Sequence, residues 1–298
     1  MNPAIMIRRL SKTYATGWHR SSVVAVSDIS LEVGRGEAFG FIGPNGAGKS
    51  TTIRILMGLS VPSDGAAELF GTNVRDPKAR LGIGYVPESP YLYDYMTPRE
   101  ILDMSLRMHR HRPDDRARHI GAWLERLGLS AVMNSSIRSF SKGMLQRVAI
   151  AQALVIQPRL LVLDEPLSGL DPIGRMDVVE LLAEYKRDGG TLFFTSHVLH
   201  DVERLADRFG LIHKGSLRSV RSPAELVGDD DVVLIRSAGA VEVPGMVVDG
   251  SNRWIGSFCR SEVWSQLDAL RLANHSVIEI KPSLSLEAAF LKIVGKQT

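Results

Sequence analysis

The chain has 298 residues, of which 44% are hydrophobic and 23% are charged, and its net charge is +3. This length predicts about two domains with sizeable cores, and the mild charge argues against a nucleic-acid partner. A single cysteine excludes an internal disulfide. No run approaches the ~20 apolar residues needed to cross a bilayer, so work at a membrane would require a second chain that spans it.

Three short apolar runs predict buried strands. They are residues 37–43, 160–163 and 191–195, and helical patterns separate them. Strands without polar alternation are typical of a parallel sheet covered on both faces, so the pattern predicts an α/β fold with a largely parallel sheet. Each run ends in glycine or in polar residues, and the carboxyl edge of such a sheet is where ligands bind.

The segment after the first run matches a phosphate-binding loop. Residues 43–50 (GPNGAGKS) fit the pattern G-x-x-x-x-G-K-[ST], and a helical pattern follows over residues 51–59. The glycines let backbone N–H groups face phosphate oxygens, while Lys49 reaches the β- and γ-phosphates and the Ser50 hydroxyl faces Mg²⁺. The residues predicted to bind ATP are Gly43, Pro44, Asn45, Gly46, Ala47, Gly48, Lys49, Ser50 and Thr51. The sequence therefore predicts that ATP and Mg²⁺ bind here and that the ATP is hydrolysed.

A second candidate phosphate site lies at Ser141. This serine is a favourable N-cap, and residues 142–156 contain few helix breakers, so we predict a helix that begins there. A helix N-terminus with a serine hydroxyl and a flexible glycine, here Gly143, suits phosphate. The alternative is an ordinary capped core helix, which leaves the Ser-x-Gly pairing unexplained.

Polar residues at the ends of the other two runs supply candidate catalytic groups. Asp164 follows the LLVL run and is placed to bind Mg²⁺, and Glu165 is the natural general base for an attacking water. His197, after TLFFTS, is placed to contact the γ-phosphate and to hold Glu165. The alternatives are a surface Asp-Glu pair and a structural histidine.

The pattern changes near residue 220, where Ser222 and Pro223 interrupt it. Strand-like pieces (VVLIR, GMVVDG, RWIGSF), a helical pattern, a strand (SVIEI) and a final helix over residues 284–294 follow. We predict two domains, residues 1–221 and a small α+β domain over residues 222–298.

Taken together, these motifs resemble the ATPase subunits of ATP-binding cassette (ABC) transporters, over about residues 4–220. The family's signature segment usually reads L-S-G-G-Q. Here residues 140–144 read FSKGM. Ser141 and Gly143 match the family pattern, whereas Phe140, Lys142 and Met144 differ from it. The resemblance implies a P-loop NTPase fold of the ABC type, with a mixed sheet and a helical subdomain at about residues 90–157.

The resemblance also implies a site shared between two chains. In the family, the signature helix of one subunit closes over ATP held by the loop of the other, in a head-to-tail dimer. Ser141, Lys142, Gly143 and Met144 would then act in trans. Asp171, in the segment SGLD, is similar to the acid of the loop that links the two sites across the dimer.

Two further residues take implied roles. Tyr14 lies where the family stacks an aromatic ring on adenine; a core aromatic of a first strand is the alternative, and Trp18 is a weaker candidate for stacking. Glu88 lies where many members carry a metal-ligating glutamine, and it adds negative charge. The implied metal ligands are Ser50, Asp164 and Glu88.

Glu88, the departing signature and a small C-terminal domain together resemble a branch of separately encoded bacterial exporter ATPases. This implies a membrane-spanning permease partner, a homodimer or a pairing with a related ATPase chain, and a position on the cytoplasmic face of the membrane through that permease. We expect the aromatic-rich residues 91–100 to dock on the permease. The alternatives are a cassette ATPase that acts on ribosomes or chromosomes and a regulatory subunit.

Overall fold

The computed structural model describes residues 2–16, 21–228 and 232–282. It divides into two compact units, Met1–Val220 and Arg221–Thr298. The strands of the first unit are β1 (Ile5–Thr16), β2 (Ser21–Val33), β3 (Ala38–Ile42), β4 (Asp64–Leu69), β5 (Thr72–Asn73), β6 (Ile83–Val86), β7 (Leu160–Leu163), β8 (Thr191–Ser196), β9 (Arg208–His213) and β10 (Ser216–Arg221). Its helices are α1 (Lys49–Leu56), α2 (Pro98–Met108), α3 (Arg116–Arg126), α4 (Lys142–Leu154), α5 (Pro172–Arg187) and α6 (Leu199–Leu205).

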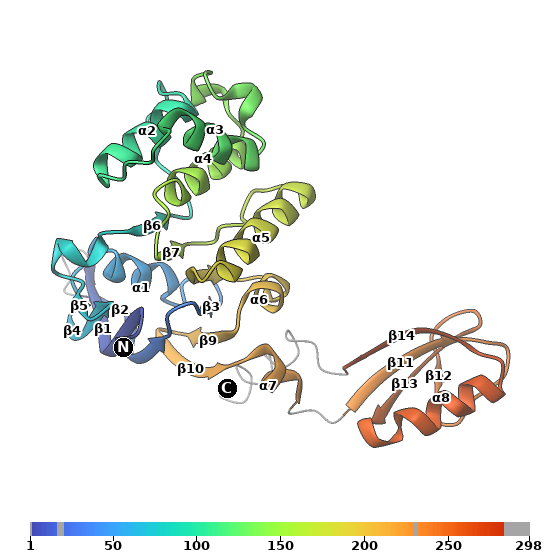
Figure 1. Ribbon diagram of the computed structural model, residues 1–298. Coiled ribbons are helices and arrows are strands. Elements are labelled where there is room, and N and C mark those ends of the chain that lie inside the picture. Colours follow the sequence, from blue (N-terminus) through green and yellow to red (C-terminus); the bar gives the residue numbers. More distant parts are fainter. Residues whose placement is uncertain (1, 17–20, 229–231, 283–298) are drawn as a thin grey trace. The chain divides into compact units, whose positions relative to one another are not determined.

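A six-stranded sheet with the order β10-β9-β3-β8-β7-β6 forms the centre of the first unit (Figure 1). The pairs β3–β8, β3–β9, β7–β8 and β6–β7 are parallel. Every residue of β3, β7 and β8 is buried, which confirms the three predicted strands within one residue at each end. Parallel pairing brings the carboxyl ends of these three strands to one edge of the sheet.

The two faces of β3 show why the sheet is buried on both sides. Phe39 and Phe41 face a core shared with α1, where each ring centroid lies within 5.9 Å of that of Phe193. Gly40 points the other way, and a Cβ there would lie 3.1 Å from Val202 of α6. Burying each phenylalanine side chain stabilises the fold by about 1.5–3 kcal/mol.

A second sheet, with the order β2-β1-β4-β5, is antiparallel and packs on the other side of the α1 core. The mixed parallel and antiparallel sheets agree with the predicted fold class. Helix α1 begins at Lys49, two residues earlier than predicted, and ends at Leu56 because Gly58 adopts a left-handed φ of +66°.

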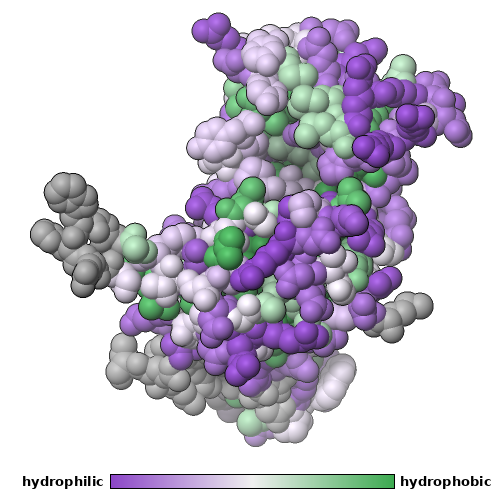
Figure 2. All heavy atoms as spheres, turned by 90° about the vertical axis from the view of Figure 1, so that its left-hand side faces the viewer, coloured by the Kyte–Doolittle hydropathy of each residue, from purple (hydrophilic) through white to green (hydrophobic). Residues whose placement is uncertain are grey.

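Helices α2, α3 and α4 gather at one end of the first unit, beyond β6 and β7 (Figure 1). Helix α2 begins with a capping box in which Thr97 and Glu100 satisfy each other's backbone N–H groups. Helix α4 begins after Ser141, as predicted, and Ser141 Oγ accepts a 3.3 Å hydrogen bond from the Met144 N–H. On the face in Figure 2, hydrophobic atoms form separate patches within a mostly hydrophilic surface.

The second unit contains α7 (Pro223–Gly228), β11 (Val232–Ala238), β12 (Val247–Val248), β13 (Arg253–Cys259), α8 (Val263–Leu272) and β14 (Ser276–Pro282). Its antiparallel sheet has the order β12-β13-β11-β14, and residues of α8 pack on its small core around Ile235 and Leu270. Cys259, at the end of β13, is exposed. The predicted final helix over residues 284–294 lies outside the described residues.

Candidate functional site

Close backbone contacts explain the glycines of the loop that joins β3 to α1. A Cβ on Gly43 would lie 2.2 Å from the carbonyl oxygen of Ile212, and one on Gly48, at φ +112°, would lie 2.5 Å from that of Ala25. Gly46 has φ +78°, and no described atom lies within 4 Å of a Cβ built there. The loop is thus packed from behind and open in front, as a phosphate cradle requires.

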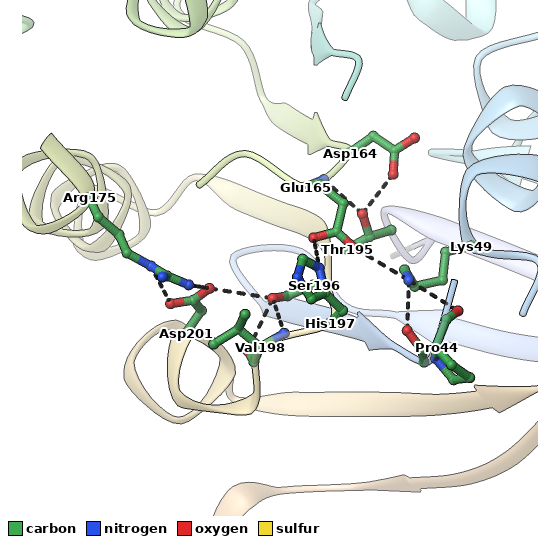
Figure 3. A network of polar contacts seen from close by, with 11 residues as sticks. Pro44, Lys49, Asp164, Glu165, Arg175, Thr195, Ser196, His197, Val198 and Asp201 are labelled. Atoms are coloured by element: carbon green, nitrogen blue, oxygen red, sulfur yellow. Dashed lines mark hydrogen bonds and ion pairs between the residues drawn. The ribbon is translucent and has the colours of Figure 1, made fainter. Parts of the chain in front are cut away.

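Lys49 is the first residue of α1, and only 6% of it is exposed. Its ammonium donates a 2.7 Å hydrogen bond to the Gly43 carbonyl oxygen and a 3.4 Å one to that of Pro44. The same ammonium lies 3.3 Å from Oε1 of Glu165 (Figure 3). The cation therefore lies over the loop, where it is hydrogen-bonded to carbonyl oxygens of the loop.

Glu165 lies just beyond β7, and 8% of it is exposed. Its φ of +51° is left-handed, which costs a non-glycine residue about 1–3 kcal/mol. Oε2 lies 2.8 Å from Nδ1 of His197 (Figure 3). Oε1 is buried and, apart from the ion pair with Lys49, makes no hydrogen bond to any described residue. A buried carboxylate oxygen with an unfilled hydrogen-bonding position is suited to receive a proton from a water molecule.

Thr195, in β8, holds the two acids that follow β7. Its Oγ1 accepts a 2.8 Å hydrogen bond from the Glu165 N–H and donates a 2.7 Å one to Oδ1 of Asp164. Burial, followed by the negative charge of Asp164, raises the pKa of the nearby Tyr85 phenol above 10, against a smaller opposing effect of Arg54. Tyr85 is therefore a neutral phenol beside Asp164 at physiological pH.

A cavity of about 450 Å³ opens over the loop. It is lined by Ala25, Pro44, Asn45, Gly46, Ala47, Gly48, Lys49, Ser50, Thr51, Glu88, Glu165, Ser168 and His197. The structure therefore brings most of the predicted phosphate-binding residues to one cavity with Glu88, Glu165 and His197. Backbone donors, a lysine and a helix N-terminus make this cavity suitable for phosphates.

The oxygen donors at the cavity fit Mg²⁺ that is bound jointly with phosphate. Ser50 and Glu88 line the cavity, whereas Asp164, which directly precedes Glu165 in the chain, is 4% exposed and is not among the lining residues. Within the described part of the chain, no group of three or more His, Cys, Asp or Glu residues is placed to hold a metal. Mg²⁺ commonly uses one or two protein oxygens together with phosphate oxygens and water, so this donor set fits it.

The signature segment does not join this cavity. Ser141 and Lys142 are exposed, and neither lines the cavity over the loop. Asp171 is the N-cap of α5 and accepts a 2.6 Å hydrogen bond from the Gly174 N–H. The side chain of Lys142 lies against the loop that precedes Asp171. A Cβ built on Gly169 of this loop would come within 2.7 Å of the Lys142 side chain. The signature segment and the Asp171 loop are thus neighbours within one chain.

Tyr14 lies in β1, paired with Val23 of β2. It is 36% exposed, and the Lys12 ammonium lies 4.8 Å from its ring centroid. This exposure does not fit the alternative of a core aromatic. Tyr14 does not line the cavity over the loop, and Trp18 lies outside the described residues.

Three residues at this site, Thr195, Arg175 and Asp201, were not predicted from the sequence. Thr195 bonds to both Asp164 and Glu165, and Arg175 forms an ion pair with Asp201 beside His197. Thr195 could have been noticed as a hydroxyl that directly follows the apolar residues 192–194 of a buried strand. The pairing of Arg175 with Asp201 carried no local signal.

A parallel sheet with a glycine-rich loop and lysine after one strand (β3), and two acids after another strand of the same sheet (β7), defines a P-loop NTPase. The protein-family model described as "ABC transporter" matches residues 26–168. An uncharacterized ABC transporter ATP-binding protein of Synechocystis is 37% identical over 92% of this chain and 80% of its own length. The Nod factor export ATP-binding protein I of Cupriavidus pinatubonensis is 32% identical over 98% of this chain and 90% of its own length.

A solved structure described as the ATP binding subunit of an ABC transporter is 31% identical, with a TM-score of 0.68 over 76% of this chain and 92% of that one. The chain belongs to the ABC transporter ATP-binding family. It is an ATPase that binds ATP. Across its described residues, no helix is long and apolar enough to span a membrane.

Proposed function

We propose that this chain energises a separate membrane-spanning permease for export, by hydrolysing ATP with Mg²⁺ at a site shared between two ATPase chains. One observation supports a shared site: the exposed N-terminus of α4, at Ser141, lies outside the cavity over the chain's own phosphate loop. A second copy, or a related chain, would supply this helix end to the phosphates. The export role is supported by likeness to a protein named for Nod factor export.

Each step of the proposed hydrolysis is assigned to residues at or next to the cavity. Lys49 and the N-terminus of α1 stabilise the phosphates, and Oε1 of Glu165 accepts a proton from the attacking water. His197 orients Glu165 through their 2.8 Å contact. Ser50, Asp164 and Glu88 would hold Mg²⁺, which offsets negative charge on the phosphoryl group when bound.

The shared site is tested by ATP-dependent dimerisation. Glu165→Gln should bind ATP without turning it over, so the molecular mass in light scattering should double when ATP is added. Adding Ser141→Ala to that variant should weaken the dimer, whereas Ser130→Ala, at another exposed serine of the helical part, should not. A mass that stays monomeric with saturating ATP would argue against a site shared between two copies of this chain, and one that stays monomeric with the related chain also present would argue against any shared site.

The permease contact is tested at the segment over residues 91–100. Tyr91, Tyr93 and Tyr95 are 97%, 56% and 72% exposed, and exposed aromatic groups are typical of protein interfaces. Replacing all three by alanine should abolish co-purification with a membrane-spanning permease encoded by a neighbouring gene. Trp264→Ala, at a 78% exposed aromatic of the second unit, is the control. Unchanged co-purification would contradict this docking surface, and co-purification with ribosomes in place of a permease would overturn the transport role.

A further inference from the structure

Arg175 and Asp201 form an ion pair next to this site, in which the carboxylate is buried and the guanidinium is partly exposed. Asp201, in the first turn of α6, is only 4% exposed. Its Oδ1 accepts a 3.1 Å hydrogen bond from Arg175 Nε, and its Oδ2 accepts a 2.6 Å one from Arg175 Nη2 (Figure 3). A bidentate pair fixes the relative orientation of its partners, and a buried carboxylate requires such a partner.

One end of this pair reaches the turn that presents His197. Oδ2 of Asp201 lies 3.4 Å from Oγ of Ser196. Ser196 Oγ accepts a 2.9 Å hydrogen bond from the Val198 N–H and lies 3.0 Å from the Val198 carbonyl oxygen. Ser196 therefore contacts Val198 across the turn, so that the residues before and after His197 are held together. His197 Nδ1 faces Glu165 (Figure 3).

The other end reaches the loop that carries Asp171. Arg175 lies in the first turn of α5, and its N–H donates a 2.9 Å hydrogen bond to the Asp171 carbonyl oxygen. A cavity of about 220 Å³ lies between this loop and the His197 turn, and Arg175 and Asp201 both line it. The pair therefore connects two segments that are separated by open space.

We propose that Arg175 and Asp201 are positioning residues for ATP hydrolysis, which orient His197 toward Glu165 and transmit a displacement of the Asp171 loop to that histidine. The proposal rests on the roles given above to Glu165 and His197. The alternative is a structural clamp between α5 and α6. The chain offers a matched control, because Lys186 in the last turn of α5 lies 2.6 Å from Asp207, which directly precedes β9.

The test uses Arg175→Gln, Asp201→Asn and the double variant in the full chain. Each single variant should lower kcat on the order of 10-fold or more, with KM for ATP little changed, because a misplaced catalytic group slows the chemical step. The double variant should be no slower than the single variants, since both break one contact. The side-chain nitrogen resonances of His197 in ¹⁵N NMR should shift in all three. Lys186→Gln and Asp207→Asn should change neither kcat nor those resonances.

Ser196→Ala is the second probe, because it leaves no buried charge without a partner and should therefore fold. It should also lower kcat and shift the His197 resonances. The proposal would be overturned if Ser196→Ala and the folded Arg175 or Asp201 variants kept the kcat and the His197 resonances of the parent protein. It would also be overturned if the decreases in kcat of the two single variants multiplied in the double variant. An effect on melting temperature alone, equal to that of the control pair, would also overturn it. A failure of the proposed function would give a different result, because Glu165→Gln would then hydrolyse ATP at the parent rate.

Discussion

The ammonium of Lys49 lies 3.3 Å from Oε1 of Glu165, and both side chains are buried. The cation expected to hold phosphate and the carboxylate expected to activate water therefore offset each other's charge. A buried charge that loses its partner is costly, so removing either side chain affects the other as well as the ligand.

Replacing Glu165 by glutamine removes its charge and keeps its shape. Lys49 then loses its competing anion, so ATP should bind at least as tightly as to the parent. Turnover should fall by about 10²–10⁴-fold, because the general base is lost. Calorimetry measures the ATP affinity, and the rate of phosphate release measures turnover. Glu180→Gln, at an exposed position of α5, is the control. Hydrolysis at the parent rate would show that Glu165 is not the base.

Lys49→Ala should weaken ATP binding by roughly 10–100-fold, because a hydrogen bond to a charged group contributes about 1.5–3 kcal/mol. It also leaves Glu165 without its cation, so the melting temperature should fall. Binding is measured at a temperature where the variant is folded, beside Lys78→Ala at an exposed lysine. Undiminished ATP affinity would count against the loop assignment.

Turnover should stop when Mg²⁺ is chelated and return when it is restored. Asp164→Asn should raise the Mg²⁺ concentration for half-maximal turnover on the order of 10-fold. Glu88→Gln should change it little, because the amide keeps an oxygen donor. Titrating Mg²⁺ against the three proteins measures this. If Asp164→Asn followed the parent curve, Asp164 would not assist the metal.

Thr195→Val preserves shape but removes both hydrogen bonds of a wholly buried hydroxyl. The free energy of unfolding should fall by about 1–3 kcal/mol for each partner left unsatisfied, and turnover should fall because Glu165 and Asp164 lose their support. Thr195→Ser keeps the hydroxyl and should retain most of both properties. Chemical denaturation and phosphate release test this, and a fully stable, active valine variant would contradict it.

The parts of the fold that were predictable are those set by local sequence. Short, mainly apolar runs predicted the central strands. The glycine pattern predicted the loop, because the loop's geometry requires residues without a Cβ. The Ser141 cap was also readable, since capping depends on residues three apart.

Other features depend on tertiary packing and had no local signal. Arg175 and Asp201 are 26 residues apart, and they meet only because α5 and α6 pack together. The left-handed backbone of Glu165 was equally hidden, because this residue type rarely adopts it and the hydroxyl that holds its N–H comes from Thr195, 30 residues away.

Cys259 is the only cysteine in the sequence, and its thiol is exposed at the end of β13. A maleimide-linked spin label or fluorophore would therefore attach at a single known point without any substitution. In a pair of identical chains, two such labels would report the distance between the second units as ATP is added and consumed. The wild-type protein thus carries its own attachment point for following the catalytic cycle by spectroscopy.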